Sequence, residues 1–487
     1  MAARASGNSV RFKRLRAGLL ILSMTAAGLG VAAPAVRAED ITGVVEEAIA
    51  TNPEIGAIKF NRRAIDHELQ AARGLRLPTV DLKTGAGRHW DTETTGAGIV
   101  DENEWHNHRE ISGTVSQRLF DGFEARHEIA RQENRVESAR WRVNDTANSV
   151  ALRAVQAYLE MQRSIAVLGA ARSNLQSLQA LNARVQERVS AGKGSSSEET
   201  EAGSRLANAV ALVAEADGRV RDADALFRSI VGRAPGTLSP VRAPSSALPN
   251  SVENAVGEAV VAAPSVIATQ HDTIAAEAAV GSAYARFSPK LNFELTGSDA
   301  HGDKEAGDST GDVRAMFVVR WNLLNGGIDR ARVYEARSRA WEASEITANT
   351  QRIIERETRV SWNAMTAAQA RVPALSRQLD LNRATRSAYS QQFDAGQRRL
   401  LDLLDVQNEV FVAEASLRTE ELVSKYNTYR VLASMGRLLP ALGLALPEEA
   451  AMPYAGSLIE SWHTDPPLLD SNWHTEVHRG DETGAAK

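Results

Sequence analysis

The chain has 487 residues, a formal net charge of −5 and no cysteine. The missing cysteines exclude a disulfide, a cysteine-bound zinc ion, a thiol nucleophile and a lipid anchor on an N-terminal cysteine. The acidic balance argues against a nucleic-acid partner, because proteins of that class present a basic face.

Residues 1–38 predict a secretory signal peptide. Basic residues precede a short apolar run at 17–33, and Val36-Arg37-Ala38 offers the small residues of a cleavage site. Cleavage after Ala38 removes six basic and no acidic residues and changes the net charge to −11. A retained membrane anchor is the alternative. No later apolar run is long enough for a spanning helix, so strands would have to make any membrane crossing.

The rest of the chain contains a long internal repeat. Two prolines recur at an offset of 211 residues and three glycines at an offset of 204. The matched positions are Pro53 and Pro264, Pro78 and Pro289, Gly122 and Gly326, Gly192 and Gly396, and Gly232 and Gly436. Such a repeat predicts a duplicated architecture. The predicted domains are a first repeat at 39–234, a proline-rich linker at 235–250, a second repeat at 251–439 and an irregular tail at 440–487.

Each repeat opens with a helix and two strands. We expect the first helix at 41–75 and its copy at 252–286, each ended by a proline. Strands are predicted near 79–88, 110–120, 290–298 and 312–323, where apolar and polar residues alternate. This alternation is typical of a membrane barrel strand. A half-buried strand of a water-soluble sheet gives the same pattern and remains the alternative.

A bend and a very long helical hairpin follow the strands of each repeat. Asp121-Gly122 and Asn325-Gly326 predict the elbows, because Asp and Asn cap helices and Gly allows a sharp bend. The stretch 122–192 contains no proline and would form a helix about 105 Å long. Its apolar residues recur every seven positions, which indicates coiled-coil packing.

Four strands cannot span a lipid bilayer alone, because an open sheet leaves unpaired backbone groups in hydrocarbon. Three chains would supply the strands of a closed twelve-stranded barrel. The predicted fold is therefore mainly α with β: a long coiled-coil helical cylinder joined to a trimeric 12-stranded transmembrane β-barrel, with an internal duplication.

The order of elements and the segment 393–408 resemble the TolC family of outer-membrane channels. That segment reads Phe-Asp-Ala-Gly-Gln-Arg-Arg-Leu-Leu-Asp-Leu-Leu-Asp-Val-Gln-Asn, and the resemblance covers roughly residues 40–440. It implies a homotrimer in the lipid of the outer membrane of a Gram-negative bacterium that extends into the periplasm. It also implies a periplasmic adaptor and an inner-membrane transporter. The sequence contains no nucleophile elbow, phosphate-binding glycine loop or HExxH motif, so we expect no enzymatic activity and no cofactor.

The resemblance assigns a gate to the second helical hairpin. Asp402 and Asp405 match the aspartates at the narrowest point, where carboxylates of three chains would attract cations. Arg398 matches a basic gate residue, and Phe393 stands where the family often has tyrosine. Glu198 lies 204 residues before Asp402 and could meet Arg398. The alternative is that both aspartates are ordinary solvated helix charges.

Type I protein secretion with an ABC transporter is the leading functional hypothesis. The stretch 403–409 looks closest to secretion members, and the missing lipid-anchor cysteine agrees. Multidrug or metal efflux is the alternative within the family. A periplasmic adaptor or structural coiled coil is the alternative from another class, although an adaptor would carry one helical hairpin. His89, His106 and His108 are better explained as polar loop residues than as a metal site.

Overall fold

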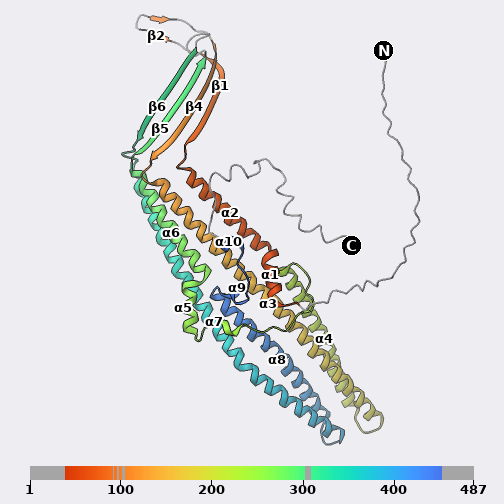
Figure 1. Ribbon diagram of the computed structural model, residues 1–487. Coiled ribbons are helices and arrows are strands. Elements are labelled where there is room, and N and C mark those ends of the chain that lie inside the picture. The colour runs from red at the N-terminus through yellow and green to blue at the C-terminus, as the bar shows by residue number, and fades with distance from the viewer. Residues whose placement is uncertain (1–38, 91–92, 96–97, 101–104, 302–308, 452–487) are drawn as a thin grey trace, which may run out of the picture.

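The computed structural model describes residues 39–90, 93–95, 98–100, 105–301 and 309–451. The predicted signal peptide and residues 452–487 of the predicted tail lie outside the described residues. The described chain is elongated, with a sheet at one end, helices along its length and two helical hairpin tips at the other end (Figure 1).

The same order of elements occurs twice. The first repeat contains α1 (Ile41–Thr51), α2 (Pro53–Gly74), β1 (Thr79–His89), β4 (His106–Phe120), α3 (Glu124–Ser190) and α4 (Ser196–Val231), with short strands β2 (Glu93–Thr95) and β3 (Gly98–Val100) between β1 and β4. The second contains α5 (Val252–Ala262), α6 (Pro264–Tyr284), β5 (Lys290–His301), β6 (Ser309–Arg320), α7 (Ile328–Asp394) and α8 (Leu400–Ser434). Short helices α9 (Leu438–Ala441) and α10 (Glu448–Ala451) follow.

The four long strands form one antiparallel sheet in the order β1-β4-β5-β6. The register places Val80, Val115, Leu295 and Ala315 in one row across the sheet, and Asp81, Thr114, Thr296 and Arg314 in the next row. Successive rows point to opposite faces, so one face is apolar and the other is polar. Ion pairs between Lys83 and Glu110 (2.6 Å) and between Glu294 and Arg320 (3.0 Å) lie on the polar face.

The apolar face of this sheet is exposed to solvent in the single chain. Its exposed large side chains include Val80, Leu82, Val313, Phe317 and Val319. Contiguous exposed apolar surface of this kind marks a face that another apolar phase or partner covers. Among the described residues, no helix has both the length and the apolar character needed to cross a membrane.

The first helix of each repeat is broken, which corrects the single helices expected at 41–75 and 252–286. Asn52 has an extended backbone (ψ 125°), and its side chain accepts a hydrogen bond from the Glu54 amide at 3.0 Å. Ala263 is also extended (ψ 133°) before Pro264. A proline disfavours helical geometry in the residue before it and suits the first turn of a new helix, so the chain restarts there.

Two very long helices run the length of the molecule. The helices α3 and α7 each contain 67 residues and are therefore about 100 Å long. Near the sheet α2, α3, α6 and α7 pack side by side, and near the tips α4 and α8 pack with α3 and α7 (Figure 1). Halfway along the molecule, the end of α4 meets the start of α2, and the end of α8 meets the start of α6.

The repeat is visible at these two junctions as a pair of matching ion pairs. Arg233 binds Glu47 at 2.7 Å in the first repeat, and Arg437 binds Glu258 at 2.8 Å in the second. The arginines are 204 residues apart and the glutamates 211, which are the offsets expected from the sequence. The ion pairs thus hold equivalent positions in the two halves.

The largest apolar cluster lies at mid-length and includes the linker. Tyr158 and Phe227 are fully buried in it, and the carbonyls of Glu39 (2.7 Å) and Ser239 (2.8 Å) both lie within hydrogen-bonding distance of the Tyr158 hydroxyl, which donates one hydrogen. Val241 of the predicted linker is buried in the same cluster.

The start of the tail is also packed, which corrects the irregular structure expected from residue 440 onward. Leu442, Leu444 and Leu446 pack against the mid-length cluster, and Glu449 of α10 pairs with Lys59 (3.4 Å) and Arg63 (2.9 Å) of α2. The sequence did not predict this packing, because the segment is rich in proline and polar residues. Its few apolar residues pack on an existing core and form no periodic pattern.

Candidate channel gate and elbows

The gate predicted from the sequence lies where the two helical hairpins turn. Gly192 and Gly396 both adopt left-handed backbone conformations at these turns (φ 71° and 73°), which glycine tolerates without strain. An apolar cluster joins the two hairpins just above the turns. Its buried members are Leu178, Leu181, Val185, Ala202, Ala209, Phe393, Leu400, Leu403, Leu404 and Val406.

The two candidate pore aspartates lie one turn apart on α8, and each forms ion pairs within the chain. Asp402 pairs with Arg399 at 3.2 Å and with Arg398 at 3.5 Å. Asp405 pairs at 3.1 Å with Arg205 of α4, so this contact joins the two hairpins. Both aspartates are therefore partly neutralised by arginine in this conformation.

The candidate gate residue Arg398 is surrounded by groups of its own hairpin. Its guanidinium lies 4.0 Å from the ring centroid of Tyr389, and its Nε donates to Gln392 Oε1 at 3.1 Å. Stacking of this kind favours arginine over lysine.

Within one chain, Glu198 and Arg398 have different partners. Glu198 forms a capping box with Ser195: the Glu198 amide donates to Ser195 Oγ at 3.3 Å, and the Ser195 amide donates to Glu198 Oε2 at 3.1 Å. This reciprocal cap satisfies two amides at the start of α4, and such a local arrangement competes with a distant cation. A serine followed three residues later by glutamate is the signal that identifies it.

Phe393 is 2% exposed and packs in the cluster above the turns. The Arg188 guanidinium lies 4.6 Å from the centroid of the Phe393 ring, and Arg188 Nη1 donates to the Phe393 carbonyl at 3.1 Å. Arg184, one turn earlier on α3, pairs with Asp394 at 3.3 Å. These arginines were missed from the sequence because they contact residues more than 200 positions away. In the sequence, these two arginines are marked only by their separation of four residues, which places them on the same side of the last turns of α3.

The first elbow is a tight, packed bend. Asp121 Oδ2 accepts a hydrogen bond from the Ala125 amide at 2.9 Å, so Asp121 caps α3 although Phe123 is the residue directly before the helix. Gly122 has φ 70°, and a Cβ at this position would lie 2.5 Å from Ser288 Cβ. Both the backbone conformation and the close packing therefore require glycine.

The second elbow is more open. Gly326 and Gly327 have positive φ (56° and 84°), and no atom lies within 4 Å of the Cβ position of either. The Asn325 carbonyl accepts from the Ile328 amide at 2.9 Å, whereas its side chain contacts only Asp329 at 3.5 Å. Asn325 therefore does not cap α7 with its side chain, although α7 begins three residues after Asn325 just as α3 begins three residues after Asp121.

A resident metal ion has no ligand set in the part of the chain that the structure describes. No group of three or more His, Asp or Glu side chains there is arranged to hold one. The loop near His106 extends in part outside the described residues.

Comparisons with known proteins agree with this geometry. The outer membrane efflux protein family matches residues 44–233 and 255–428, which correspond to the two repeats. Outer membrane efflux protein BepC of Brucella suis biovar 1 (strain 1330) is 23% identical over 458 residues, covering 92% of this chain and 96% of BepC.

Solved outer-membrane channels share the fold. VceC from Vibrio cholerae superposes with a TM-score of 0.70 at 15% identity, covering 84% of this chain and 97% of VceC. The open state of the MtrE channel from Neisseria gonorrhoeae gives a TM-score of 0.69 at 16% identity, covering 82% of this chain and 89% of MtrE. The chain belongs to the outer membrane efflux protein family and is an outer-membrane channel that extends into the periplasm.

Proposed function

We propose that three copies of this chain close a twelve-stranded barrel in the outer membrane and form the exit conduit of a tripartite export machine. The observation that carries the proposal is the sheet, which has one exposed apolar face, one charged face and strands β1 and β6 paired on one side only. Unpaired strand edges in lipid cost several kcal/mol per group, and joining edges of neighbouring copies removes that cost. The apolar face then meets lipid and the charged face lines the pore.

Membrane fractionation and chemical cross-linking test the assembly. The protein should co-sediment with outer membranes and cross-link to a trimer. A monomeric, water-soluble protein with no membrane-inserted state would contradict the proposal. A periplasmic adaptor is disfavoured because the chain repeats the order strand, strand, helix, helix twice.

For the cargo, we propose type I protein secretion, with a periplasmic adaptor and an ABC-type inner-membrane transporter as partners. The support is the tip segment 403–409 and the lack of a cysteine for a lipid anchor. Small-molecule efflux is the second candidate, favoured by the name of the relative BepC, an efflux protein. Cross-linking in cells followed by purification distinguishes them: an ABC transporter supports secretion, and a proton-driven pump supports efflux.

For the gate, we propose that Asp402 and Asp405 form the carboxylate ring at the narrowest point and that Arg205 restrains Asp405. Single-channel recordings should show weaker block by divalent cations in the double variant Asp402→Ala, Asp405→Ala. The variant Asp394→Ala removes a nearby carboxylate outside the ring and serves as the control. Arg205→Ala frees Asp405 and should strengthen the block. Unchanged block in the double variant would remove both aspartates from the ring.

A further inference from the structure

The two free edges of the sheet belong to different repeats. Strand β1 of the first repeat and strand β6 of the second are each paired on one side only. The two repeats also meet inside the chain, where β4 of the first pairs with β5 of the second. In a ring of three such chains, each contact between chains therefore corresponds to the β4–β5 contact inside one chain. This correspondence rests on the proposed trimer.

The strands of the two repeats are equivalent residue by residue. Thr79 lies opposite Ser116 in the first repeat, and Lys290 lies opposite Arg320 in the second. The members of these two pairs are 211 and 204 positions apart, which are the offsets of the prolines and glycines. The pairing of strands within a repeat is thus the same in both halves.

The ends of β4 and β6 are anchored by equivalent hydrogen bonds. Gln117 Nε2 donates to the Arg76 carbonyl at 3.0 Å, and Trp321 Nε1 donates to the Phe287 carbonyl at 3.0 Å. The donors are 204 residues apart and the acceptors 211. The equivalence of the repeats therefore extends from the strands into the elbows.

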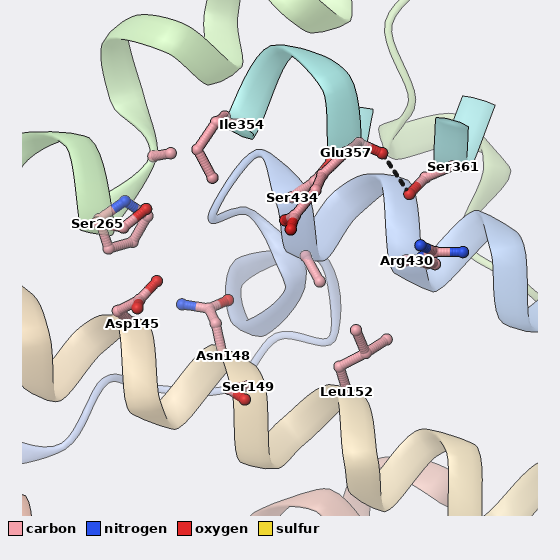
Figure 2. Close-up of a pocket in the computed structure, with 13 residues that line it drawn as sticks. Asp145, Asn148, Ser149, Leu152, Ser265, Ile354, Glu357, Ser361, Arg430 and Ser434 are labelled. Atoms are coloured by element: carbon pink, nitrogen blue, oxygen red, sulfur yellow. Dashed lines mark hydrogen bonds between the residues drawn. The ribbon is translucent and has the colours of Figure 1, made fainter. Parts of the chain in front are cut away.

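At mid-length the repeats agree in backbone arrangement but differ in side chains. Asn52 Nδ2 donates to the Ile230 carbonyl at 3.2 Å and so joins the start of α2 to the end of α4. The equivalent of Asn52 is Ala263, and a pocket of about 300 Å³ lies there, beside Ser265 of α6 and Ser434 of α8 (Figure 2). The strands and elbows, where contacts coincide, are the better guide to how repeats meet.

The second elbow lacks a partner that the first elbow has. In the first repeat, residues 117–120 belong to β4, which pairs with β5. Their equivalents, residues 321–324, follow the end of β6 and pair with no strand in the described part of the chain. Leu323 and Leu324 of this segment are 77% and 86% exposed. Adjacent exposed leucines at a strand end indicate a surface that another chain covers.

The elbow glycines show the same difference. A Cβ at Gly122 would lie 2.5 Å from Ser288 Cβ of the other repeat, whereas no atom lies within 4 Å of the Cβ position of Gly326. The equivalent of Ser288 is Leu77, which is 51% exposed and precedes β1. In one chain, Leu77 and Gly326 lie at opposite edges of the sheet. The equivalent contact therefore requires Leu77 of a neighbouring copy.

We propose that β1 of a neighbouring copy completes the second elbow, where residues 321–324 extend β6 and pair with it. The β4–β5 register, moved by the two offsets, places Trp321 opposite Leu82 and Asn322 opposite Asp81 of the neighbouring copy. The template pairs are Gln117 with Phe293 and Arg118 with Asn292. Apolar Trp321 and Leu82 then share the lipid face, and polar Asn322 and Asp81 share the pore face. A slip of one residue would mix the two faces.

Disulfide cross-linking tests this register, because the chain contains no cysteine of its own. Asn322→Cys is combined with Asp81→Cys, and the full-length protein is oxidised in outer membranes and separated on a non-reducing gel. Opposed residues have Cα atoms about 4.5–5.5 Å apart, which suits a disulfide. Within one chain the two positions are three strand spacings, or about 14 Å, apart. A disulfide must therefore join two copies, and linked dimers and trimers should appear.

The matched controls combine Asn322→Cys with Thr79→Cys or with Lys83→Cys. Both positions lie on the same face of β1 as Asp81, two residues away on either side. Residues that are diagonal across two strands lie about 7–8 Å apart, which is too far for a disulfide without backbone movement. Both control variants should therefore lose the disulfide-linked species.

An amine-reactive cross-linker shows independently whether each variant forms trimers. Trimers without a disulfide in the Asp81→Cys variant, or with as much disulfide in a control variant, overturn the register and leave the proposed trimer intact. If substitution of Asn322 prevents assembly, Val319→Cys with Thr84→Cys measures the same register farther along the strands and should link equally well. Absence of trimers in the cross-linked wild type contradicts the proposed assembly, and the register with it.

Discussion

The orientation of the sheet can be tested with two arginine substitutions at adjacent positions. Phe317 lies on the apolar face of β6, is 71% exposed and contacts Phe293 at a ring-centroid distance of 5.3 Å. Met316 points to the opposite face and lies directly across from Glu294. The variants Phe317→Arg and Met316→Arg therefore place the same charge on the same strand but on different faces.

The two variants should differ strongly in membrane insertion. Arginine on the lipid face near mid-membrane costs about 2–4 kcal/mol, and loss of the aromatic pair adds about 0.5–1.5 kcal/mol. A total of about 2.5–5.5 kcal/mol lowers the ratio of inserted to uninserted protein by a factor on the order of 10² to 10⁴. Arginine at position 316 would meet Glu294, which already pairs with Arg320 at 3.0 Å, so it should be tolerated.

The assay is the fraction of protein that resists urea extraction from outer membranes, compared at equal expression. Phe317→Arg should be depleted from this fraction and Met316→Arg should match the wild type. If both variants insert equally well, or if Met316→Arg is the one excluded, the assignment of the lipid face is wrong.

Two further predictions concern the interior. Gly436→Ala should lower the free energy of unfolding by about 1–3 kcal/mol more than Gly443→Ala in urea titrations. Both glycines have positive φ, but only a Cβ at Gly436 would meet another residue, at 2.4 Å from Pro264 Cδ; equal losses would contradict the packing argument. Burial raises the pKa of both Tyr158 and Tyr429 from 10.0 to about 12, with nearby Asp40 adding to both shifts. Because the pKa of each tyrosine is higher in the folded than in the unfolded protein, each tyrosine stabilises the folded protein fully below pH 10. This contribution is lost as the pH rises toward 12. The loss should be about 2–3 kcal/mol for each tyrosine, and Tyr158→Phe should reduce it.

The sequence predicted the architecture well because its signals are local and periodic. Alternation in the strands identified the two faces of the sheet, and the registers then placed Val80 beside Val115 and Asp81 beside Thr114. The heptads anticipated the long helices. The glycine at each turn was identified because a left-handed backbone strongly favours that residue.

Contacts between the hairpins could not be read in the same way. The pairs of Arg188 with Phe393 and Arg205 with Asp405 depend on how α3 and α4 are rotated against α7 and α8. Heptad spacing gives the buried stripe of each helix but not which charged residues meet beside it. The break at Pro53 was missed for a related reason: helical pattern continues on both sides, and the single restricted residue before the proline decides the outcome.

The two repeats differ in the side-chain caps at the starts of their helices. In the first repeat, the backbone amides of Glu54, Ala125 and Glu198 each donate to a capping side chain. The equivalent amides of the second repeat, at Ser265, Asp329 and Asp402, have no side-chain cap. The start of α5 is the exception, since Ser251 caps it while Asp40 does not cap α1. The differences cluster at the elbow, the mid-length junction and the tip, where the chain changes direction.

A lost side-chain cap costs about 1 kcal/mol, which raises local opening about fivefold. Hydrogen exchange should therefore be faster at Ser265, Asp329 and Asp402 than at their equivalents in the first repeat. The Ala263→Asn variant should slow exchange at Ser265 alone, because it restores one cap without touching the others. Equal rates within all three pairs would show that packing of the surrounding helices, rather than capping, sets the local stability of the channel wall. A faster rate confined to Asp402 would show that only the tip differs between the repeats.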